Sequence, residues 1–174
     1  QEGKRALLEI ARRSIQKGDE DSFQSRASDP YLGQYQAVFV TLTKAGQLRG
    51  CIGHTTPRWP LAEAVSRMAF SAAYNDSRFP PVDPAEIPDL EIEVSILSPF
   101  EEVREIEEIC VGEDGLVVEK DGYRGLLLPQ VAASRGWDRL QFLSHTCKKA
   151  GLGEKAWNDP ETRIYRFQAY VFGE

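Results

Sequence analysis

An arginine and a cysteine two positions apart form the pattern in this sequence that is best suited to chemistry. Arg49, Gly50 and Cys51 stand in a run that ends at Gly53. On an extended strand alternate side chains share a face, so Arg49 and Cys51 would lie side by side. A neighbouring cation favours the ionised thiol, which attacks electrophiles or binds metals. Cys51 is therefore a candidate nucleophile or thiol carrier. Arg49 would activate it or hold an anionic group.

A structural role is the alternative for this cysteine. Free cysteines are among the most frequently buried residues, so Cys51 also suits a strand core, with Arg49 as an ordinary surface charge. The two glycines, Gly50 and Gly53, would let a ligand or another backbone segment approach closely. We therefore treat both glycines as candidate ligand-binding positions.

Two histidines offer a base for such a thiol. His54 lies three residues after Cys51, and His145 lies two before Cys147. Tertiary structure would have to bring either one to Cys51, and a solvated surface histidine is the commoner case. Together, Cys51, His54, His145 and Cys147 would also have the composition of a two-cysteine, two-histidine zinc site. Because positions 145 and 147 are about 200° apart on a helix, we expect no metal there and assign Cys147 to the core.

A charged pair in a rigid loop is the next candidate. Asp76 and Arg78 stand between Asn75 and Pro80-Pro81, and prolines stiffen such loops. In one interpretation they bind a ligand at the rim of a pocket. In the other they cap the preceding helix and form a solvent-screened ion pair that contributes little.

Periodicity predicts the elements that position these residues. An amphipathic helix is expected to end at Gly18, and residues 19–34 are polar and irregular. The expected elements of the first half are a helix over 4–17, a strand over 37–43, a turn over 44–47, a returning strand that contains Cys51, a helix over 61–75 and a half-buried strand over 90–97. The second helix would expose Glu63, Ser66 and Arg67.

The second half repeats this order. A hairpin over 115–128 turns at Asp121-Gly122, a helix over 137–150 carries Leu140, Leu143, Cys147 and Ala150 on one stripe, and a strand covers 164–172. Arg124-Gly125 follows Arg49-Gly50 by 75 positions, and Leu126 stands where the first copy has Cys51. We predict an internal duplication within one domain over 1–174, with repeats over about 35–98 and 112–173. The fold class is α+β, with a largely antiparallel, barrel-like sheet flanked by helices.

Composition narrows the classes of function. The 174 residues are 41% hydrophobic and carry a net charge of −6, which disfavours nucleic-acid and membrane-surface binding. Three cysteines form an odd set, which favours a reducing compartment, so we expect a cytoplasmic protein. The sequence contains no Gly-rich phosphate loop and no His-Glu-x-x-His motif, and we expect no cofactor.

Several motifs together resemble the AMMECR-one domain family. The motifs that carry the resemblance are Leu48-Arg49-Gly50-Cys51-Ile52-Gly53, Asp76-Ser77-Arg78-Phe79, Ile92 to Pro99, Leu128-Pro129-Gln130-Val131, Gly136-Trp137-Asp138 and Lys149-Ala150-Gly151-Leu152. The resemblance covers nearly the whole chain. His145-Thr146-Cys147 is similar to the prokaryotic members in particular.

This resemblance implies a barrel-like sheet built from two related repeats and an active or binding site at Arg49–Gly53. No reaction is established for the family. Prokaryotic members are often encoded beside, or fused to, Memo-like and radical SAM proteins, which implies a shared modification pathway. Two hypotheses follow: an accessory enzyme that uses Cys51, and a non-catalytic module that binds a partner protein or a small anion through the same surface.

Overall fold

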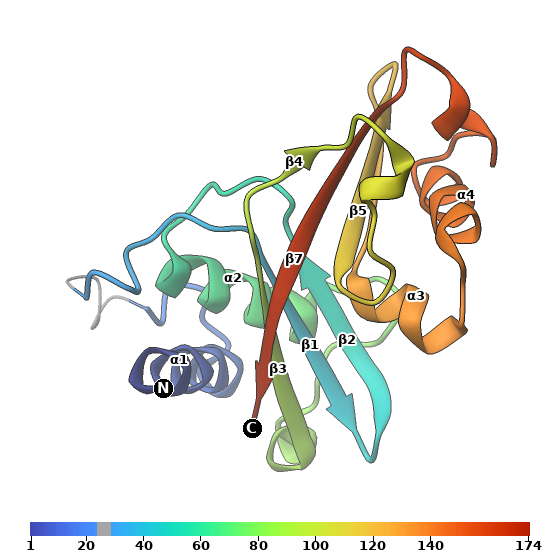
Figure 1. The fold of residues 1–174 in the computed structure, drawn as a ribbon. Helices are drawn as coiled ribbons and strands as arrows, with labels where there is room; N and C mark the ends of the chain where they lie inside the picture. Colours follow the sequence, from blue (N-terminus) through green and yellow to red (C-terminus); the bar gives the residue numbers. More distant parts are fainter. Residues whose placement is uncertain (24–28) are drawn as a thin grey trace. The chain divides into compact units, whose positions relative to one another are not determined.

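The computed structural model describes residues 1–23 and 29–174 of the chain. It contains two compact units. Unit 1 comprises Gln1–Ile96 together with Tyr170–Glu174, and unit 2 comprises Leu97–Ala169. The chain therefore leaves unit 1 once and returns to it with its last strand, β7 (Arg163–Gly173), which is the long dark red arrow in Figure 1.

Unit 1 is an antiparallel sheet with helices. Its elements are α1 (Glu2–Lys17), β1 (Val38–Lys44), β2 (Gln47–Gly53), α2 (Leu61–Tyr74), the 3-10 helix η2 (Pro84–Asp89) and β3 (Leu90–Leu97). β1 lies between β2 and β3 and is antiparallel to both. The end of β7 joins this unit, where the backbone N–H of Glu174 donates to the oxygen of Ile92.

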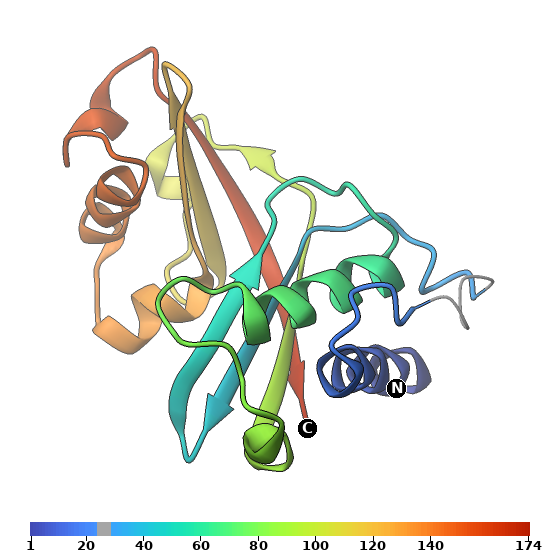
Figure 2. The same ribbon diagram turned by 180° about the vertical axis from the view of Figure 1, so that it is seen from behind.

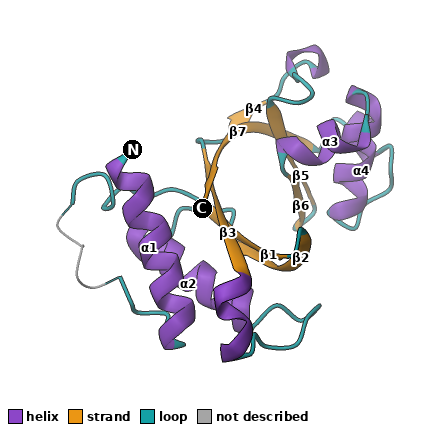
Figure 3. Cartoon of the chain, turned by 90° about the horizontal axis from the view of Figure 1, so that it is seen from below, coloured by secondary structure: helices purple, strands orange, loops and turns teal. Residues whose placement is uncertain are grey.

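One face of this sheet forms the core of unit 1. Val38, Val40 and Leu42 alternate along β1 and are fully buried, as the period of a half-buried strand requires. α2 packs on this face, and α1 packs on α2. The two helices lie on the same side of the strands in Figures 2 and 3. β2 is the edge strand of this sheet.

Unit 2 pairs its strands in the same manner. Its elements are β4 (Glu101–Glu102), the 3-10 helix η3 (Ile106–Glu108), β5 (Asp114–Lys120), β6 (Tyr123–Leu127), α3 (Pro129–Arg135), α4 (Arg139–Lys149), the 3-10 helix η4 (Ala156–Asn158) and most of β7. β5 lies between β6 and β7, and β4 pairs with β7 on its other side, all antiparallel. Phe142, Leu143 and Cys147 of α4 are fully buried in the core.

The α+β class with antiparallel pairing is confirmed. In each unit a hairpin precedes a helical segment and then a strand that pairs with the first strand of the hairpin. Gly50 of β2 lies against Ala72 of α2, and Gly125 of β6 lies against Ala150 after α4, so close that a Cβ would overlap the backbone. The duplication and the single domain remain predictions.

The helix expected over 137–150 is confirmed as α4, but a separate helix that the sequence analysis did not predict precedes it. α3 already spans Pro129–Arg135 and ends at Gly136, whose φ of 63° is left-handed. Asp138 then caps α4 through the N–H of Gln141. Leu140 is 48% exposed and is not part of the buried stripe, where Phe142 takes the expected place.

The polar face expected for the second helix is wrong at Ser66. Ser66 is fully buried because α1 covers that side of α2, and the Ser14 hydroxyl donates to the Ser66 carbonyl oxygen. Of the irregular segment over 19–34, residues 24–28 lie outside the described residues. Within 1–23 and 29–174, no helix is long and apolar enough to cross a membrane.

Candidate functional site

Cys51 lies near the middle of the edge strand β2 and is partly exposed. It stands opposite Thr41 of β1, and the Thr41 hydroxyl oxygen is 3.2 Å from the Cys51 sulfur. Neighbouring Gly50 packs on α2, so the alternation of the strand places Cys51 on the other face of the sheet. The thiol is therefore in contact with a polar hydroxyl group and is not sealed in the apolar core of unit 1.

A β-bulge changes the position of Arg49. Leu48 pairs with Thr43 and Gly50 with Leu42, so Arg49 between them has no partner on β1. The bulge breaks the alternation on which the expected Arg49 and Cys51 pair rests. Arg49 instead donates to both carboxylate oxygens of Glu86, at 2.8 and 3.2 Å.

The Arg49 and Glu86 pair is mostly buried and tightly held. Hydrogen bonds from Arg49 lower the pKa of Glu86 to about 2, with help from the backbone N–H of Asp83 and from Lys44. The Lys44 amino nitrogen is 3.5 Å from the same carboxylate. Arg49 Nη1 is buried with no hydrogen-bond partner among the described residues. The charge of Arg49 is therefore largely neutralised by Glu86.

Asp76 and Arg78 contact Cys51 directly. The backbone N–H of Cys51 donates to Asp76 Oδ2 at 2.9 Å, and Arg78 Nη2 donates to the Cys51 carbonyl oxygen at 3.2 Å. Arg78 also donates through Nε and Nη2 to the two oxygens of Asp76, at 3.0 and 2.8 Å. The pair thus satisfies the open edge of β2 as a neighbouring strand would. It brings together three of the residues that the sequence singled out.

The two members of this pair differ in exposure. The Asp76 side chain is 3% exposed, whereas that of Arg78 is 55% exposed. Arg78 holds the pKa of the Asp76 carboxyl far below its usual range, so Asp76 is ionised and is no solvent-screened cap. Arg78 in turn has a raised pKa, mainly through Asp76 and to a smaller extent through Cys51. Arg78 is thus the cation anchored beside Cys51.

His54 follows the end of β2 and is turned toward its own loop. Its Nδ1 is 2.6 Å from the Thr56 carbonyl oxygen, and its ring meets Trp59 edge-on at 5.2 Å. Burial lowers the pKa of His54, so the ring is neutral at pH 7 and Nδ1–H donates to Thr56. Its Nε2 is buried without a partner in the described part of the chain.

His145 and Cys147 belong to α4 in unit 2, whereas Cys51 belongs to unit 1. The His145 ring stacks on Trp137 with 3.8 Å between centroids. Cys147 is fully buried, which confirms it as a core residue, and burial raises the pKa of its thiol. No cluster of three or more His, Cys, Asp and Glu side chains suited to a metal ion occurs within 1–23 and 29–174.

Two residues of this site were not found by sequence reasoning. Thr41 is an ordinary strand residue until the hairpin register places it opposite Cys51. Glu86 does carry a local signal, because Asp83 and Glu86 form a capping box at the start of η2. That signal predicts a helical turn but not the ion pair with Arg49, which is 37 positions away.

Comparison with known proteins gives one consistent result. The model of the AMMECR1 family matches residues 8–172. A protein of Methanothermobacter thermautotrophicus is 49% identical over 98% of this chain and 93% of its own length. Protein TK0174 of Thermococcus kodakarensis is 44% identical over 97% of this chain and 88% of its own length. The crystal structure of the uncharacterized protein PH0010 from Pyrococcus horikoshii, 42% identical, superimposes with a TM-score of 0.86 over 97% of this chain and 89% of that one.

Proposed function

This chain belongs to the AMMECR1 family, and we propose that it is an accessory enzyme whose reactive group is the thiol of Cys51. The observation that carries the proposal is that, on an edge strand, a hydroxyl contacts this sulfur and an anchored cation contacts the backbone of the same residue. Thr41 offers its hydroxyl at 3.2 Å, and Asp76 fixes Arg78 beside the same residue. Arg78 takes the role that the sequence analysis gave to Arg49.

The arrangement suits a thiolate that attacks an electrophilic carbon. The Thr41 hydroxyl donates to the sulfur once the thiol proton has left to solvent. The new bond joins sulfur to carbon, and the leaving group departs with the electron pair. Arg78, which is half exposed, also attracts an anionic group on the substrate. The family resemblance suggests that Memo-like and radical SAM proteins act in the same pathway.

The second candidate is a module that binds a partner protein or a small anion without catalysis. One observation favours it. The Arg78 side chain is 55% exposed, and no hydrogen bond within the described residues engages its Nη1. An anion bound there would lie beside Gly50–Gly53 and would need no reactive sulfur.

Alkylation separates the two candidates. We expect iodoacetamide at pH 7 to modify Cys51 about tenfold faster than Cys110, a solvent-exposed internal reference in the same chain, when both are followed by peptide mass spectrometry. Thr41→Val keeps the shape of the strand residue and removes the hydroxyl, so it should lower the alkylation rate of Cys51 and leave that of Cys110 unchanged. Lys148→Gln, an exposed change in unit 2, is the matched control and should leave both rates unchanged.

Protection of Cys51 at every pH, or a rate equal to that of Cys110, would contradict the thiol proposal. Partner binding then tests the second candidate. If Cys51→Ser binds a Memo-like protein of the same organism as tightly as the wild type and Arg78→Gln does not, the surface acts by binding alone. If Arg78→Gln binds equally well, the second candidate is also wrong.

A further inference from the structure

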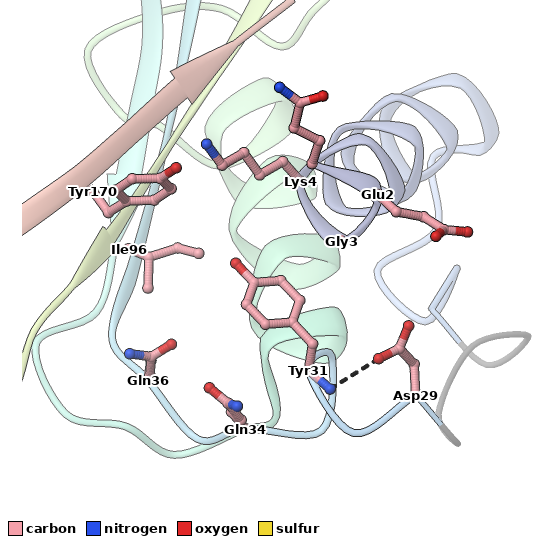
Figure 4. A pocket seen from close by; sticks show the side chains of 10 residues that line it. Glu2, Gly3, Lys4, Asp29, Tyr31, Gln34, Gln36, Ile96 and Tyr170 are labelled. Atoms are coloured by element: carbon pink, nitrogen blue, oxygen red, sulfur yellow. Dashed lines mark hydrogen bonds between the residues drawn. The ribbon is translucent and has the colours of Figure 1, made fainter.

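A cavity of about 610 Å³ lies in unit 1 and is made by residues that the sequence analysis did not single out. Its wall comes from the first turn of α1, the segment that follows residue 29, the end of β3 and the end of β7. Figure 4 shows their side chains around a common space. Its lining includes Lys4, Tyr31, Gln34, Gln36, Ile96 and Tyr170. The volume is that of a typical small-molecule site.

Aromatic rings and one cation form the inner wall. The Lys4 amino nitrogen lies 4.3 Å from the ring centre of Tyr170 and 5.9 Å from that of Phe172. Tyr31 packs its ring on Gly3, where a Cβ would overlap it. In Figure 4 the Tyr31 hydroxyl points into the space that Ile96 and Tyr170 border from the other side. Such a wall offers tyrosine rings to a flat ligand, because aromatic rings stack on one another.

The polar groups of the wall have unused hydrogen-bonding capacity. Within the described residues, no hydrogen bond engages the side-chain amides of Gln34 and Gln36 or the hydroxyls of Tyr31 and Tyr170, and Lys4 has no carboxylate partner. A few convergent polar groups on a partly apolar wall are typical of ligand sites. The amides can pair with the edge of a heterocycle, and Lys4 can pair with an anion.

Two carboxylates at the rim narrow the class of ligand. Glu2 and Asp29 line the cavity, and Figure 4 shows both at the end away from Tyr170. The backbone N–H of Tyr31 donates to one oxygen of Asp29 at 2.8 Å. The rim therefore suits hydroxyl or amino donors and repels a second anion. A compact dianion such as sulfate would pair with Lys4, but it has no hydroxyl or amino group to donate to the two carboxylates.

We propose that this cavity binds a nucleoside monophosphate: Lys4 holds the phosphate, the rings of Tyr31 and Tyr170 stack on the base, Gln34 and Gln36 pair with the edge of the base, and the carboxylates at the rim accept from the ribose hydroxyls. The proposal does not depend on Cys51. An aromatic amino acid also combines a ring with charges of both signs, but it has no edge for the two glutamines, so it is the rival in the test.

The test titrates the full chain, labelled with nitrogen-15, with AMP, GMP, CMP and UMP, and separately with adenosine, inorganic phosphate and tryptophan. We expect at least one mononucleotide to bind with a Kd below about 1 mM and to shift the side-chain amide signals of Gln34 and Gln36. Adenosine and inorganic phosphate should each bind at least about tenfold more weakly, because each contains only half of the ligand.

Two variants locate the site. Lys4→Gln removes the cation and should weaken binding about tenfold, the effect of losing one charged hydrogen bond. Gly3→Ala favours the helix but displaces the Tyr31 ring, so it should weaken binding without unfolding the protein. Lys17→Gln, at the other end of α1, is the control and should bind as the wild type does. Absence of mononucleotide binding, equal binding of phosphate or tryptophan, or unchanged affinity in both variants would overturn the proposal.

Discussion

Two arginines are candidates for the cation beside Cys51, and only Arg78 contacts the backbone of that residue. Arg49 is adjacent in sequence, but Glu86 receives both of its hydrogen bonds and neutralises its charge. Arg78 is anchored by Asp76 and also contacts the Cys51 backbone. A buried ion pair is stable only when both members are retained, because an unpaired buried charge is costly. The Arg49 and Glu86 pair is therefore expected to contribute to stability rather than to chemistry.

The stability contribution of Glu86 depends on pH with a definite sign. Its pKa is lowered to about 2 in the folded protein from an ordinary value of 4.5. A depressed pKa adds stability above the unfolded value, and this gain is lost as the pH falls from about 4.5 toward 2. We expect Glu86→Gln to lower the free energy of unfolding by about 2 kcal/mol at pH 7 and to have little effect near pH 2. Urea unfolding at several pH values measures this difference.

Glu91→Gln is the control for that series, because Glu91 is an exposed residue of β3 with no ion pair among the described residues. It should change the free energy of unfolding by less than about 0.5 kcal/mol at any pH. A Glu86→Gln effect that stays constant from pH 7 to pH 2 would show that the lost interaction does not depend on ionisation of Glu86.

The sequence predicts the position of Cys51 in a hairpin strand but not its neighbours. Alternation and the turn over 44–47 are local, and both are seen in β1 and β2. The bulge at Arg49 depends on how β2 pairs with β1, and the residue types in this segment do not predict it. The contact of Asp76 with Cys51 joins residues 25 positions apart, so it requires the packing of α2 on the hairpin. Arg78 was singled out from its loop, but its place at Cys51 was not.

At the scale of elements, contact between a glycine and a helix sets the packing in each unit. Gly50→Ala would place a methyl group on the Ala72 carbonyl oxygen, and Gly125→Ala would place one on the backbone of Ala150. Backbone cannot move aside as a flexible side chain does. We expect each change to lower the free energy of unfolding by about 1–3 kcal/mol, measured by urea denaturation. Gly153→Ala is the matched control, because no atom lies within 4 Å of its added methyl group. Equal effects at all three positions would contradict the packing argument.

The two hairpin turns differ by one residue and allow a reciprocal test. Ala45-Gly46 has φ values of 50° and 74°, and Asp121-Gly122 has 51° and 81°. Such turns favour Asn or Asp at the first position, and alanine is strained there. Ala45→Asn should therefore raise the free energy of unfolding by about 0.5–1 kcal/mol, and Asp121→Ala should lower it by a similar amount. Thermal unfolding by circular dichroism measures both. Destabilisation by Ala45→Asn would show that the Ala45 side chain has a packing role.

The elements predicted best are those whose signals are local. The strand over 90–97 and the helix from Leu61 match β3 and α2 closely. α3 was missed although Pro129 at its first turn and Gly136 after its end are ordinary boundary signals, because the helix has only seven residues and too few turns for a periodic pattern. Ser66 was misplaced for another reason: its burial depends on α1, which is distant in sequence.

At the scale of the whole molecule, the return of the chain to unit 1 is the feature least visible in the sequence. Residues 164–172 read as one continuous strand, yet Tyr170–Glu174 belong to unit 1 and the preceding part of β7 to unit 2. The end of β7 supplies Tyr170 to the cavity and Glu174 to α1. Local periodicity contains no information on which strand a strand end pairs with, because the pattern of alternation is the same along the whole of β7.

The side chain of Arg12 holds the end of β7 in unit 1. Arg12 of α1 donates to Glu174, 162 positions away, and to the carbonyl oxygens of Ile87 and Leu90 at 2.9 and 2.6 Å. It thus joins α1, the start of β3 and the end of β7 within unit 1. We expect Arg12→Gln to destabilise the protein more than Glu174→Gln does, because only the arginine change also removes the hydrogen bonds to the two carbonyl groups.

A double-mutant cycle isolates the ion pair from those other contacts. Because both side chains are partly buried, at 22% and 32% exposed, we expect a coupling of about 1 kcal/mol between Arg12 and Glu174 in urea unfolding. Lys148 and Glu154 in unit 2 form an exposed control pair, 54% and 57% exposed, whose coupling should not exceed about 0.5 kcal/mol. Hydrogen exchange should also quicken in α1 when either member of the first pair is replaced. A coupling as small as that of the control would mean that the strand end is held by its backbone bond to Ile92 instead of by the ion pair.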